Sequence, residues 1–332
     1  MKKVIALAGN PNVGKSTVFN ALTGMNQHTG NWPGKTVGSA RGFCRRGDMV
    51  WEWVDLPGCY SLMAHSEEEE IARDFICFGH PDAVVIVCDA ACLERNLNLA
   101  LQILEITDRA LLCVNLLDEA EKNRIRVDLP ELSRELGIPA VGTAARSGKG
   151  LEGILEGLKE LSRIENHPPA VQYPPEIQEA FSILEPALKK IWPEEKNLNW
   201  MCGKLLAGSQ SFLDALERHL GISLSEEPEV SEALKQAKIC LREKGISQEE
   251  IENRMAEVYV RRAEEICNKT VIFENQQYLR KDRRLDWLFT SRKTGFLMMF
   301  LMLTLIFWIT VSGANIPSEL LAEGLFWIQD RM

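Results

Sequence analysis

Short apolar runs alternate with helical patterns from the N-terminus to about Leu161, and this alternation limits the possible fold more than any other feature. Strands are predicted at Val4–Ala8, Val50–Val54, Ala83–Cys88, Ala110–Val114 and Pro139–Val141. Helices are predicted at Lys15–Leu22, Leu93–Ile106, Leu129–Leu136 and Leu151–Leu161. Such alternation is typical of an α/β fold, in which helices cover both faces of a mostly parallel sheet. Ligands of these sheets bind at the carboxyl ends of the strands.

Prolines after residue 166 end this pattern, and the chain that follows has the period of helices alone. One apolar stripe is formed by Ile177, Phe181, Leu184, Leu188 and Ile191. Ser247 and Glu250 have the spacing of a capping box that opens a later helix. We therefore predict a first domain over residues 1–166 and an all-helical domain over residues 167–275. The charged residues of the helical domain are expected to form a solvated face.

The segment from Gly295 to Val311 contains no charged residue. A helix of this length rises about 25 Å, and residues 312–314 extend it toward the roughly 30 Å of a bilayer core. We therefore predict a transmembrane helix over residues 295–314, and a buried core helix is the competing interpretation. A basic linker over residues 276–294 precedes it, and a tail over residues 315–332 follows. The basic linker is expected to contact lipid headgroups, and the positive-inside rule places the N-terminal domains in the cytoplasm.

The chain carries 38 Lys and Arg residues against 47 Asp and Glu residues, a formal net charge of −9. This acidic balance argues against nucleic acid as a general partner. The nine cysteines include no C-x-x-C pair and no histidine spacing that suggests zinc, so we expect buried reduced thiols in a cytosolic environment. The first residues lead directly into a predicted strand, and no signal peptide is expected.

The sequence GNPNVGKS matches the phosphate-loop pattern G-x-x-x-x-G-K-[ST] between a predicted strand and a predicted helix. Residues expected to contact the nucleotide here are Gly9, Asn10, Pro11, Asn12, Val13, Gly14, Lys15, Ser16 and Thr17. Gly9 and Gly14 allow consecutive backbone N–H groups to face an anion, and the helix N-terminus adds its dipole. Lys15 is expected to reach the β- and γ-phosphates, and the Ser16 hydroxyl to ligate Mg²⁺. This motif alone does not distinguish ATP from GTP.

A base-reading loop is predicted directly after the strand at 110–114. It comprises Asn115, Leu116, Leu117 and Asp118. The Asp118 carboxylate accepts hydrogen bonds from guanine N1–H and the 2-amino group, whereas adenine would leave it unpaired. Asn115 is expected to tie this loop to the phosphate loop, and Leu116 stands where the GTPase consensus has lysine. After the last strand, backbone N–H groups of Thr143, Ala144 and Ala145 are expected to face guanine O6.

Two switch segments are predicted between the phosphate loop and the base-reading loop. The second contains Asp55, Leu56, Pro57 and Gly58, where Asp55 holds Mg²⁺ through a water and the Gly58 N–H meets the γ-phosphate. The first contains Gly34, Lys35, Thr36 and Val37. Thr36 is the expected ligand of Mg²⁺ and the γ-phosphate, and Thr29 is its rival. Catalysis is assigned to Lys15, Thr36 and Gly58.

In many GTPases a glutamine directly after D-x-x-G positions the attacking water. This chain has Cys59 and then Tyr60 in that region. Neither side chain can position water in the same way. We therefore predict slow intrinsic hydrolysis, unless another residue or a bound cation supplies the missing stabilisation.

The motifs GNPNVGKST, NWPGKTV, DLPGCYSL and NLLD, followed by a helical region and a basic-flanked apolar segment, resemble the N-terminal part of the FeoB ferrous-iron transporter family. The resemblance implies a helical domain like the family's guanine-dissociation-inhibitor domain, which favours retention of GDP. Asn12 matches the phosphate-loop Asn that helps coordinate K⁺ in potassium-activated members. The resemblance also implies a cell (inner) membrane location, Fe²⁺ transport and a polytopic permease portion or subunit as partner, and a homo-oligomer is a further expectation. One helix cannot enclose an ion path, so the chain is expected to be a fragment or a short relative.

Three functions are compatible with these patterns. The first is a regulatory GTPase module of an Fe²⁺ uptake system, and the second is a membrane-tethered regulatory GTPase without a transport role. The third is a P-loop ATPase or kinase, against which Asp118 argues. Met298, Met299 and Met302 are interpreted as packing or lipid-facing side chains and not as metal ligands.

Overall fold

The computed structural model describes residues 2–24, 27–32, 35, 37–46, 49–63, 66–161, 168–192, 197–224, 226–273 and 294–310, apart from the side chains of residues 27–29 and 249. The chain divides into two compact units, Met1–Ile272 and Phe273–Met332. The first unit contains the α/β region and the helical region together.

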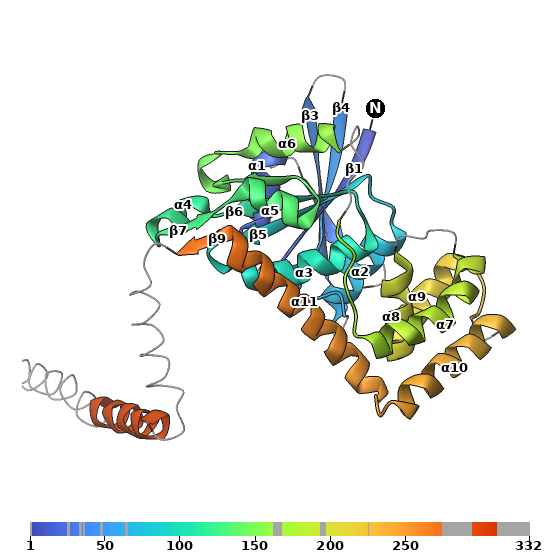
Figure 1. Ribbon diagram of the computed structural model, residues 1–332. Helices are drawn as coiled ribbons and strands as arrows, with labels where there is room; N and C mark the ends of the chain where they lie inside the picture. The colour runs from blue at the N-terminus through green and yellow to red at the C-terminus, as the bar shows by residue number, and fades with distance from the viewer. Residues whose placement is uncertain are drawn as a thin grey trace, which may run out of the picture. The chain divides into compact units, whose positions relative to one another are not determined.

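A seven-stranded sheet with the order β2-β3-β4-β1-β5-β6-β8 is the centre of the first unit (Figure 1). The strands are β1 (Lys2–Gly9), β2 (Gln27–Asn31), β3 (Gly38–Arg46), β4 (Met49–Asp55), β5 (Ala83–Asp89), β6 (Ala110–Asn115) and β8 (Ala140–Gly142). From β4 to β8 neighbouring strands are parallel, which confirms the predicted mostly parallel sheet. Strands β2 and β3 form an antiparallel edge that the sequence patterns did not indicate.

The register brings the carboxyl ends of the parallel strands to one edge. Leu7 lies opposite Asp55, Gly9 lies opposite Val87, and Asp89 lies opposite Asn115. The loops that follow β1, β4 and β6 therefore leave the sheet side by side. These loops carry the three predicted nucleotide motifs.

Helices cover both faces of the sheet. They are α1 (Lys15–Thr23), α2 (Glu67–Phe78), α3 (Leu93–Ile106), α4 (Leu117–Lys122), α5 (Leu129–Leu136) and α6 (Leu151–Glu160). Along β1, Ile5 and Leu7 belong to the core formed with α1 and α6, whereas Ala6 and Ala8 belong to the core of the opposite face. This alternation is that of a strand buried on both sides.

The helical region consists of α7 (Pro175–Ile191), α8 (Leu198–Ala207), α9 (Gln210–Leu220), α10 (Pro228–Glu243) and α11 (Gln248–Thr270). Its core is continuous with the sheet face that Ala6 and Ala8 occupy, so the two regions share one hydrophobic core. The capping box of Ser247 and Glu250 opens α11, as predicted. Strand β9 (Val271–Phe273) follows α11 and pairs with β7 (Ile125–Val127).

One prediction for the helical region is wrong in part. Its charges do not all form a solvated face, because the Lys204 side chain is only 1% exposed. Of the cysteines, Cys92 is exposed and Cys240 is partly exposed, while the other seven are buried.

The second unit contains one described helix, over residues 294–310. Its large apolar side chains between Phe296 and Ile309 are exposed, apart from Met298, which is partly exposed. Within the described ranges, no helix combines the length and the apolar character needed to cross a bilayer. Parts of the predictions for this end of the chain lie outside the described residues. They are residues 276–293 of the predicted linker, residues 311–314 of the predicted span and the whole tail at 315–332.

Candidate nucleotide-binding site

The phosphate loop leaves β1 with two residues in the left-handed backbone region, Asn12 at φ 67° and Gly14 at φ 81°. A Cβ atom on Gly9 would lie 2.5 Å from the carbonyl oxygen of Val87, and one on Gly14 would collide with Asn115 Nδ2. Glycine is therefore required at both positions, as the motif predicts. Ser16 and Thr17 are exposed in the first turn of α1.

Lys15 and Asp55 form an ion pair at the end of the sheet. The Lys15 ammonium also donates to the carbonyl oxygen of Leu56 at 2.5 Å. Burial raises the pKa of Asp55, and the positive charge of Lys15 opposes that shift. The two side chains expected to hold phosphate and Mg²⁺ therefore neutralise each other.

The donor set at this edge fits a hard cation. The Asp55 carboxylate and the Ser16 hydroxyl are both oxygen ligands, the type that Mg²⁺ prefers. Asn10 adds an unusual feature, because it is 2% exposed and neither atom of its amide has a hydrogen-bond partner among the described residues. Buried amides without partners are costly, so a polar ligand in the loop would relieve this cost.

Asn115 connects three loops. Its Nδ2 donates to the carbonyl oxygen of Val13 at 3.0 Å, which is the expected tie to the phosphate loop. Its Oδ1 accepts from the Thr143 hydroxyl at 3.0 Å and from the Ala145 N–H at 3.1 Å. The side chain is 1% exposed, so these bonds are shielded from water.

The backbone N–H groups after β8 are already engaged. Those of Thr143, Ala144 and Ala145 donate to Val114, Lys149 and Asn115, at 2.8, 3.0 and 3.1 Å. They build the loop in this structure, and a contact of this segment with guanine O6 stays a prediction.

The base-reading loop begins with Leu116 at φ 60°, a conformation that costs energy for a residue with a branched side chain. Leu117 N–H then donates to the Thr143 carbonyl at 3.2 Å. Asp118 follows in the first turn of α4 with an exposed carboxylate. The strained turn places this acid just after the end of β6, and its contact with a base stays a prediction.

The D-x-P-G segment lies against the phosphate loop. A Cβ atom on Gly58 would lie 3.3 Å from the Pro11 Cα, and the Cys59 N–H donates to the Gly9 carbonyl at 3.3 Å. Burial raises the pKa of the Cys59 thiol to about 12, so this group is neutral at physiological pH. Tyr60 is exposed, with the Arg95 guanidinium 4.3 Å from its ring centroid.

Of the first switch, Gly34 and Thr36 lie outside the described residues. Lys35, expected at the nucleotide, instead pairs with Glu70 on α2 at 2.8 Å, and this hydrogen bond raises the pKa of Lys35. The Trp32 ring packs edge-on against Phe75 of α2, with the ring centroids 5.5 Å apart. The Trp32 N–H donates to the Val37 carbonyl at 2.9 Å, which closes the turn.

The rival threonine belongs to a strand. The Thr29 backbone lies opposite Ala40 in the antiparallel ladder of β2 and β3. Its side chain is not among those described, so the choice between Thr29 and Thr36 stays a prediction.

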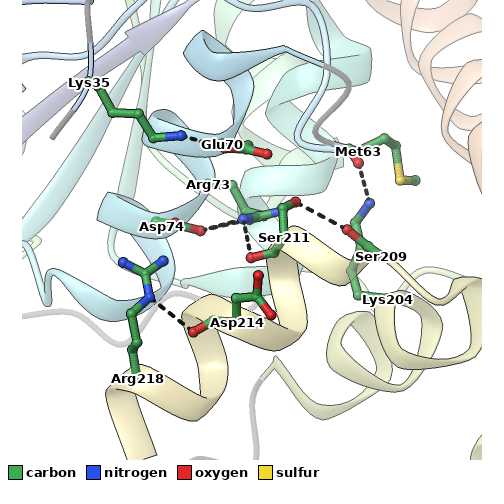
Figure 2. Close-up of polar contacts among 10 residues, drawn as sticks. All are labelled: Lys35, Met63, Glu70, Arg73, Asp74, Lys204, Ser209, Ser211, Asp214 and Arg218. Carbon is green, nitrogen blue, oxygen red and sulfur yellow. Dashed lines mark hydrogen bonds and ion pairs between the residues drawn. The ribbon is translucent and has the colours of Figure 1, made fainter.

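Contacts between the segment that follows the second switch and the helical region were not predicted. Figure 2 shows Arg73 of α2 pointing to Ser211 at the start of α9, with its guanidinium 3.2 Å from the Ser211 hydroxyl and 3.3 Å from its carbonyl oxygen. The same guanidinium pairs with Asp74 at 2.7 Å. The Lys204 ammonium of α8 donates to the Met63 carbonyl at 2.7 Å. We call these contacts of Arg73 and Lys204 the switch joint.

These features define the class of the protein. A parallel sheet whose strand ends present G-x-x-x-x-G-K-S, D-x-P-G and N-x-x-D loops is that of a P-loop GTPase domain. The sequence profile described as Ferrous iron transport protein B matches residues 3–158, and the profile of the FeoB cytosolic helical domain matches residues 173–272. The chain belongs to the FeoB family, with its GTPase domain and its helical domain.

Similar proteins agree with this assignment. The Fe(2+) transporter FeoB of Escherichia coli K12 is 37% identical over 236 residues, which cover 68% of this chain and 30% of the relative. An Fe(2+) transport protein A/FeoB fusion protein of Porphyromonas gingivalis is 32% identical over 342 residues, covering 98% of this chain and 38% of the relative. The chain thus spans about a third of the length of these curated relatives.

Solved structures give the same result. The cytosolic domain of T. maritima FeoB in its apo form has a TM-score of 0.66 and 30% identity, covering 82% of this chain and all of that one. A single-residue mutant of S. thermophilus NFeoB bound to GDP has a TM-score of 0.68 and 27% identity, covering 81% of this chain and all of that one.

Proposed function

We propose that this chain is the GTP-binding and slowly GTP-hydrolysing regulatory module of a membrane transporter for ferrous iron. The observation that carries the proposal is the meeting of Lys15, Asp55 and the Asn115 loop at one edge of the sheet. The transport role rests on the family, since the matched relatives are Fe(2+) transporters.

Binding of GTP requires Lys15 to exchange its partner. In the proposed bound state the ammonium turns from Asp55 to the β- and γ-phosphates, and the loop amides and the α1 dipole complete the anion site. Ser16, Asp55 and Thr36 would then hold Mg²⁺, which neutralises charge on the phosphates. The Gly58 N–H would meet the γ-phosphate, so its loss after hydrolysis releases the D-x-P-G loop.

Slow hydrolysis follows from the residue after Gly58. The Cys59 thiol is buried, and burial raises its pKa to about 12, so it neither accepts a proton from water nor positions it. Asn12 is exposed in the phosphate loop and is the residue we assign to K⁺. A potassium ion there would place positive charge near the transferred group.

Single-turnover hydrolysis in K⁺ and in Na⁺ buffer tests this part. We expect turnover to be faster in K⁺ and the difference to vanish in Asn12→Ala. Asn268→Ala, an exposed change on α11, is the matched control and should behave as wild type. Equal rates in both buffers would remove K⁺ from the proposal, and rapid turnover in Na⁺ without a partner would contradict the slow rate.

The helical domain is proposed to retain GDP and to relay the nucleotide state toward the membrane. The switch joint supports this, because α2 and the Met63 loop follow the D-x-P-G segment and are held directly by α8 and α9. Shortening the chain to residues 1–166 would lose these contacts. GDP release measured with the full chain and with this shortened form should then be faster for the latter.

Residues 295–314 are proposed to cross the cell (inner) membrane, with both domains on the cytoplasmic side. The exposed apolar side chains of the helix at 294–310 support a lipid environment for it. The proposed partners are GTP and GDP, the bilayer, the remaining permease portion or a permease subunit, and a second copy of the chain. Ferrous-iron uptake in cells with and without the gene tests the role. Unchanged uptake would favour the alternative, a membrane-tethered regulatory GTPase without transport.

A further inference from the structure

Three side chains that the nucleotide site does not use meet between the two domains. Glu105 belongs to α3, Tyr173 precedes α7, and Tyr259 lies in the middle of α11. The Tyr173 hydroxyl lies 2.5 Å from Glu105 Oε2 and 2.8 Å from the Tyr259 hydroxyl. The Tyr259 hydroxyl also contacts the same Glu105 oxygen. The three oxygen atoms therefore form a closed triangle.

A closed triangle of oxygens needs one hydrogen for each of its three sides. The two phenols supply one each, since burial and the Glu105 carboxyl raise the pKa of both tyrosines. An ionised Glu105 has no hydrogen to add, so one side of the triangle is left without a donor. A protonated Glu105 supplies the third hydrogen. The geometry is thus that of a carboxylic acid.

The surroundings of Glu105 favour the same form. Burial raises the pKa of Glu105 to about 7, although both tyrosine hydrogen bonds oppose that shift. The carboxyl borders a cavity of about 600 Å³, which gives it access to protons from solvent.

The other charged groups at this cavity come from the turn after α3 and from α11. Asp108 follows α3, and Arg261, Arg262 and Glu265 lie on α11, while α8 contributes the neutral Asn199. Arg262 is paired with Glu135 of α5 at 3.0 Å.

Glu105 lies one helical turn from Gln102, which binds the segment just after the second switch. Gln102 Oε1 of α3 accepts from the Leu62 N–H at 2.8 Å and from the Ser61 hydroxyl at 3.0 Å. Residues three apart lie on the same side of a helix. Neighbouring side chains of α3 therefore hold the segment after the second switch, through Gln102, and the helical domain, through Glu105.

We propose that Glu105, Tyr173 and Tyr259 form a proton-operated latch, which holds α11 on α3 while Glu105 is protonated and loosens when Glu105 is ionised. The latch would make the contact between the GTPase and helical domains respond to pH near neutrality. It does not depend on nucleotide binding or on transport.

The direction in which pH changes the opening of the latch follows from proton linkage. The folded latch binds its proton more tightly than an opened one, in which Glu105 has its ordinary value of 4.5. The latch is therefore complete at low pH, weakens as the pH rises from 4.5 through 7, and levels off above that. Between pH 6 and pH 8 the opening equilibrium constant should rise about tenfold, and most of this rise falls below pH 7.

Hydrogen exchange of the full, nucleotide-free chain in detergent micelles tests the latch. Peptides that cover Tyr259 and the end of α3 report its opening, after correction for intrinsic exchange. We expect the corrected rate of wild type to rise about tenfold from pH 6 to pH 8. In Glu105→Gln, whose amide supplies a hydrogen at every pH, the rate should stay near the wild-type value at pH 6. Glu94→Gln, an exposed change on the same helix, should keep the wild-type dependence.

Infrared difference spectra give a second measurement that does not rely on opening. Wild type should show the carbonyl band of a protonated acid at pH 6, which disappears at pH 8 and is missing in Glu105→Gln. A flat wild-type exchange profile, an unchanged profile in Glu105→Gln, or no such band would each overturn the latch. None of these results depends on whether the chain binds GTP.

Discussion

The nucleotide site and the switch joint hold their charges in opposite ways. At the nucleotide site, Ser16 and Asp118 are exposed, and the residues of each single motif lie within a few positions of one another in the sequence. At the switch joint, Arg73 and Lys204 are almost completely buried, and their partners across the joint, Ser211 and Met63, lie 138 and 141 residues away.

This difference separates the residues that should determine nucleotide affinity from those that should determine folding stability. The exposed polar groups of the nucleotide site, such as Ser16 and Asp118, are proposed to be completed by a ligand, so changing one should alter affinity and hardly alter folding. The charges of the switch joint are completed by the protein itself. Removing one partner leaves buried groups unpaired, so folding should suffer first. The following variants test that contrast.

Asp118→Asn should have the largest effect. Loss of the carboxylate should weaken GTP binding about 1000-fold, or about 4 kcal/mol, because the amide presents a donor to guanine donors. Xanthosine triphosphate, which has a carbonyl at position 2, should bind the variant better than GTP. Titration with fluorescent nucleotides measures both.

Glu119→Gln, the exposed neighbour on α4, serves as the control for affinity. The unfolding free energy of Asp118→Asn should stay within about 0.5 kcal/mol of wild type. An unchanged preference for GTP in Asp118→Asn would show that the base is read elsewhere.

Arg73→Ala should come next and act on folding. It removes the contacts with Ser211 and Asp74, and we expect about 3 kcal/mol of lost stability in urea unfolding. GTP affinity should change far less. Arg134→Ala breaks an exposed ion pair with Glu131 and should cost under 1 kcal/mol. Equal costs for the two variants would mean that the buried charge has no special role.

Lys204→Met should remove one contribution to the pH dependence of the free energy of unfolding. Burial lowers the pKa of Lys204 to about 8 from its ordinary 10.5, so above pH 8 the folded state holds fewer protons than the unfolded state. The contribution of Lys204 to wild-type stability should therefore rise from pH 8 toward pH 10.5, by up to about 1.4 kcal/mol per pH unit, while buried thiols such as Cys59 contribute in the opposite direction above pH 9.

Urea unfolding of Lys204→Met at pH 8, 9 and 10 should lack that rise. Lys190→Met changes an exposed lysine that pairs with Glu229, and it should retain the wild-type slope. The same slope in both variants would assign the titration to another group.

The pair of Lys35 and Glu70 should give the smallest effect. Both side chains are partly exposed, at 33% and 25%, so their coupling should be about 0.5 kcal/mol and weaker in high salt. A double-mutant cycle with Lys35→Ala and Glu70→Ala measures it. A coupling above about 2 kcal/mol would place this pair with the buried charges.

Local signals predicted much of the fold. The bounds of α3 and α5 agree with the prediction, because both helices have a clear apolar stripe and α5 begins with Asp128 as its cap. The phosphate loop and the Asn115 tie were also predicted, since their residues lie next to strand ends.

Other elements carry weak or misleading signals. Helix α2 begins with four glutamates, a run that is typical of a solvated segment, although Ser66 caps it and Ile71 and Ile76 are buried. Strand β3 is exposed at most of its positions, so it lacks the apolar alternation that identified the central strands.

Buried charges were the principal omission. Nothing beside Arg73, Glu105 or Lys204 in the sequence distinguishes them from surface residues, because their partners, apart from Asp74 next to Arg73, come from distant segments. Only the packing of the helical domain on α2 and α3 makes them special. Sequence patterns of one chain do not contain that information.

Helix α11 runs without interruption from Ser247 to β9, a rod of about 34 Å. Along it, Glu252 meets α8, Tyr259 meets α3, and Lys269 meets Glu135 of α5. Because the helix is one rigid element, a tilt of about 5° about one end would displace the other end by about 3 Å. Small rearrangements around the Met63 loop would thus be amplified into a movement as large as a hydrogen bond is long.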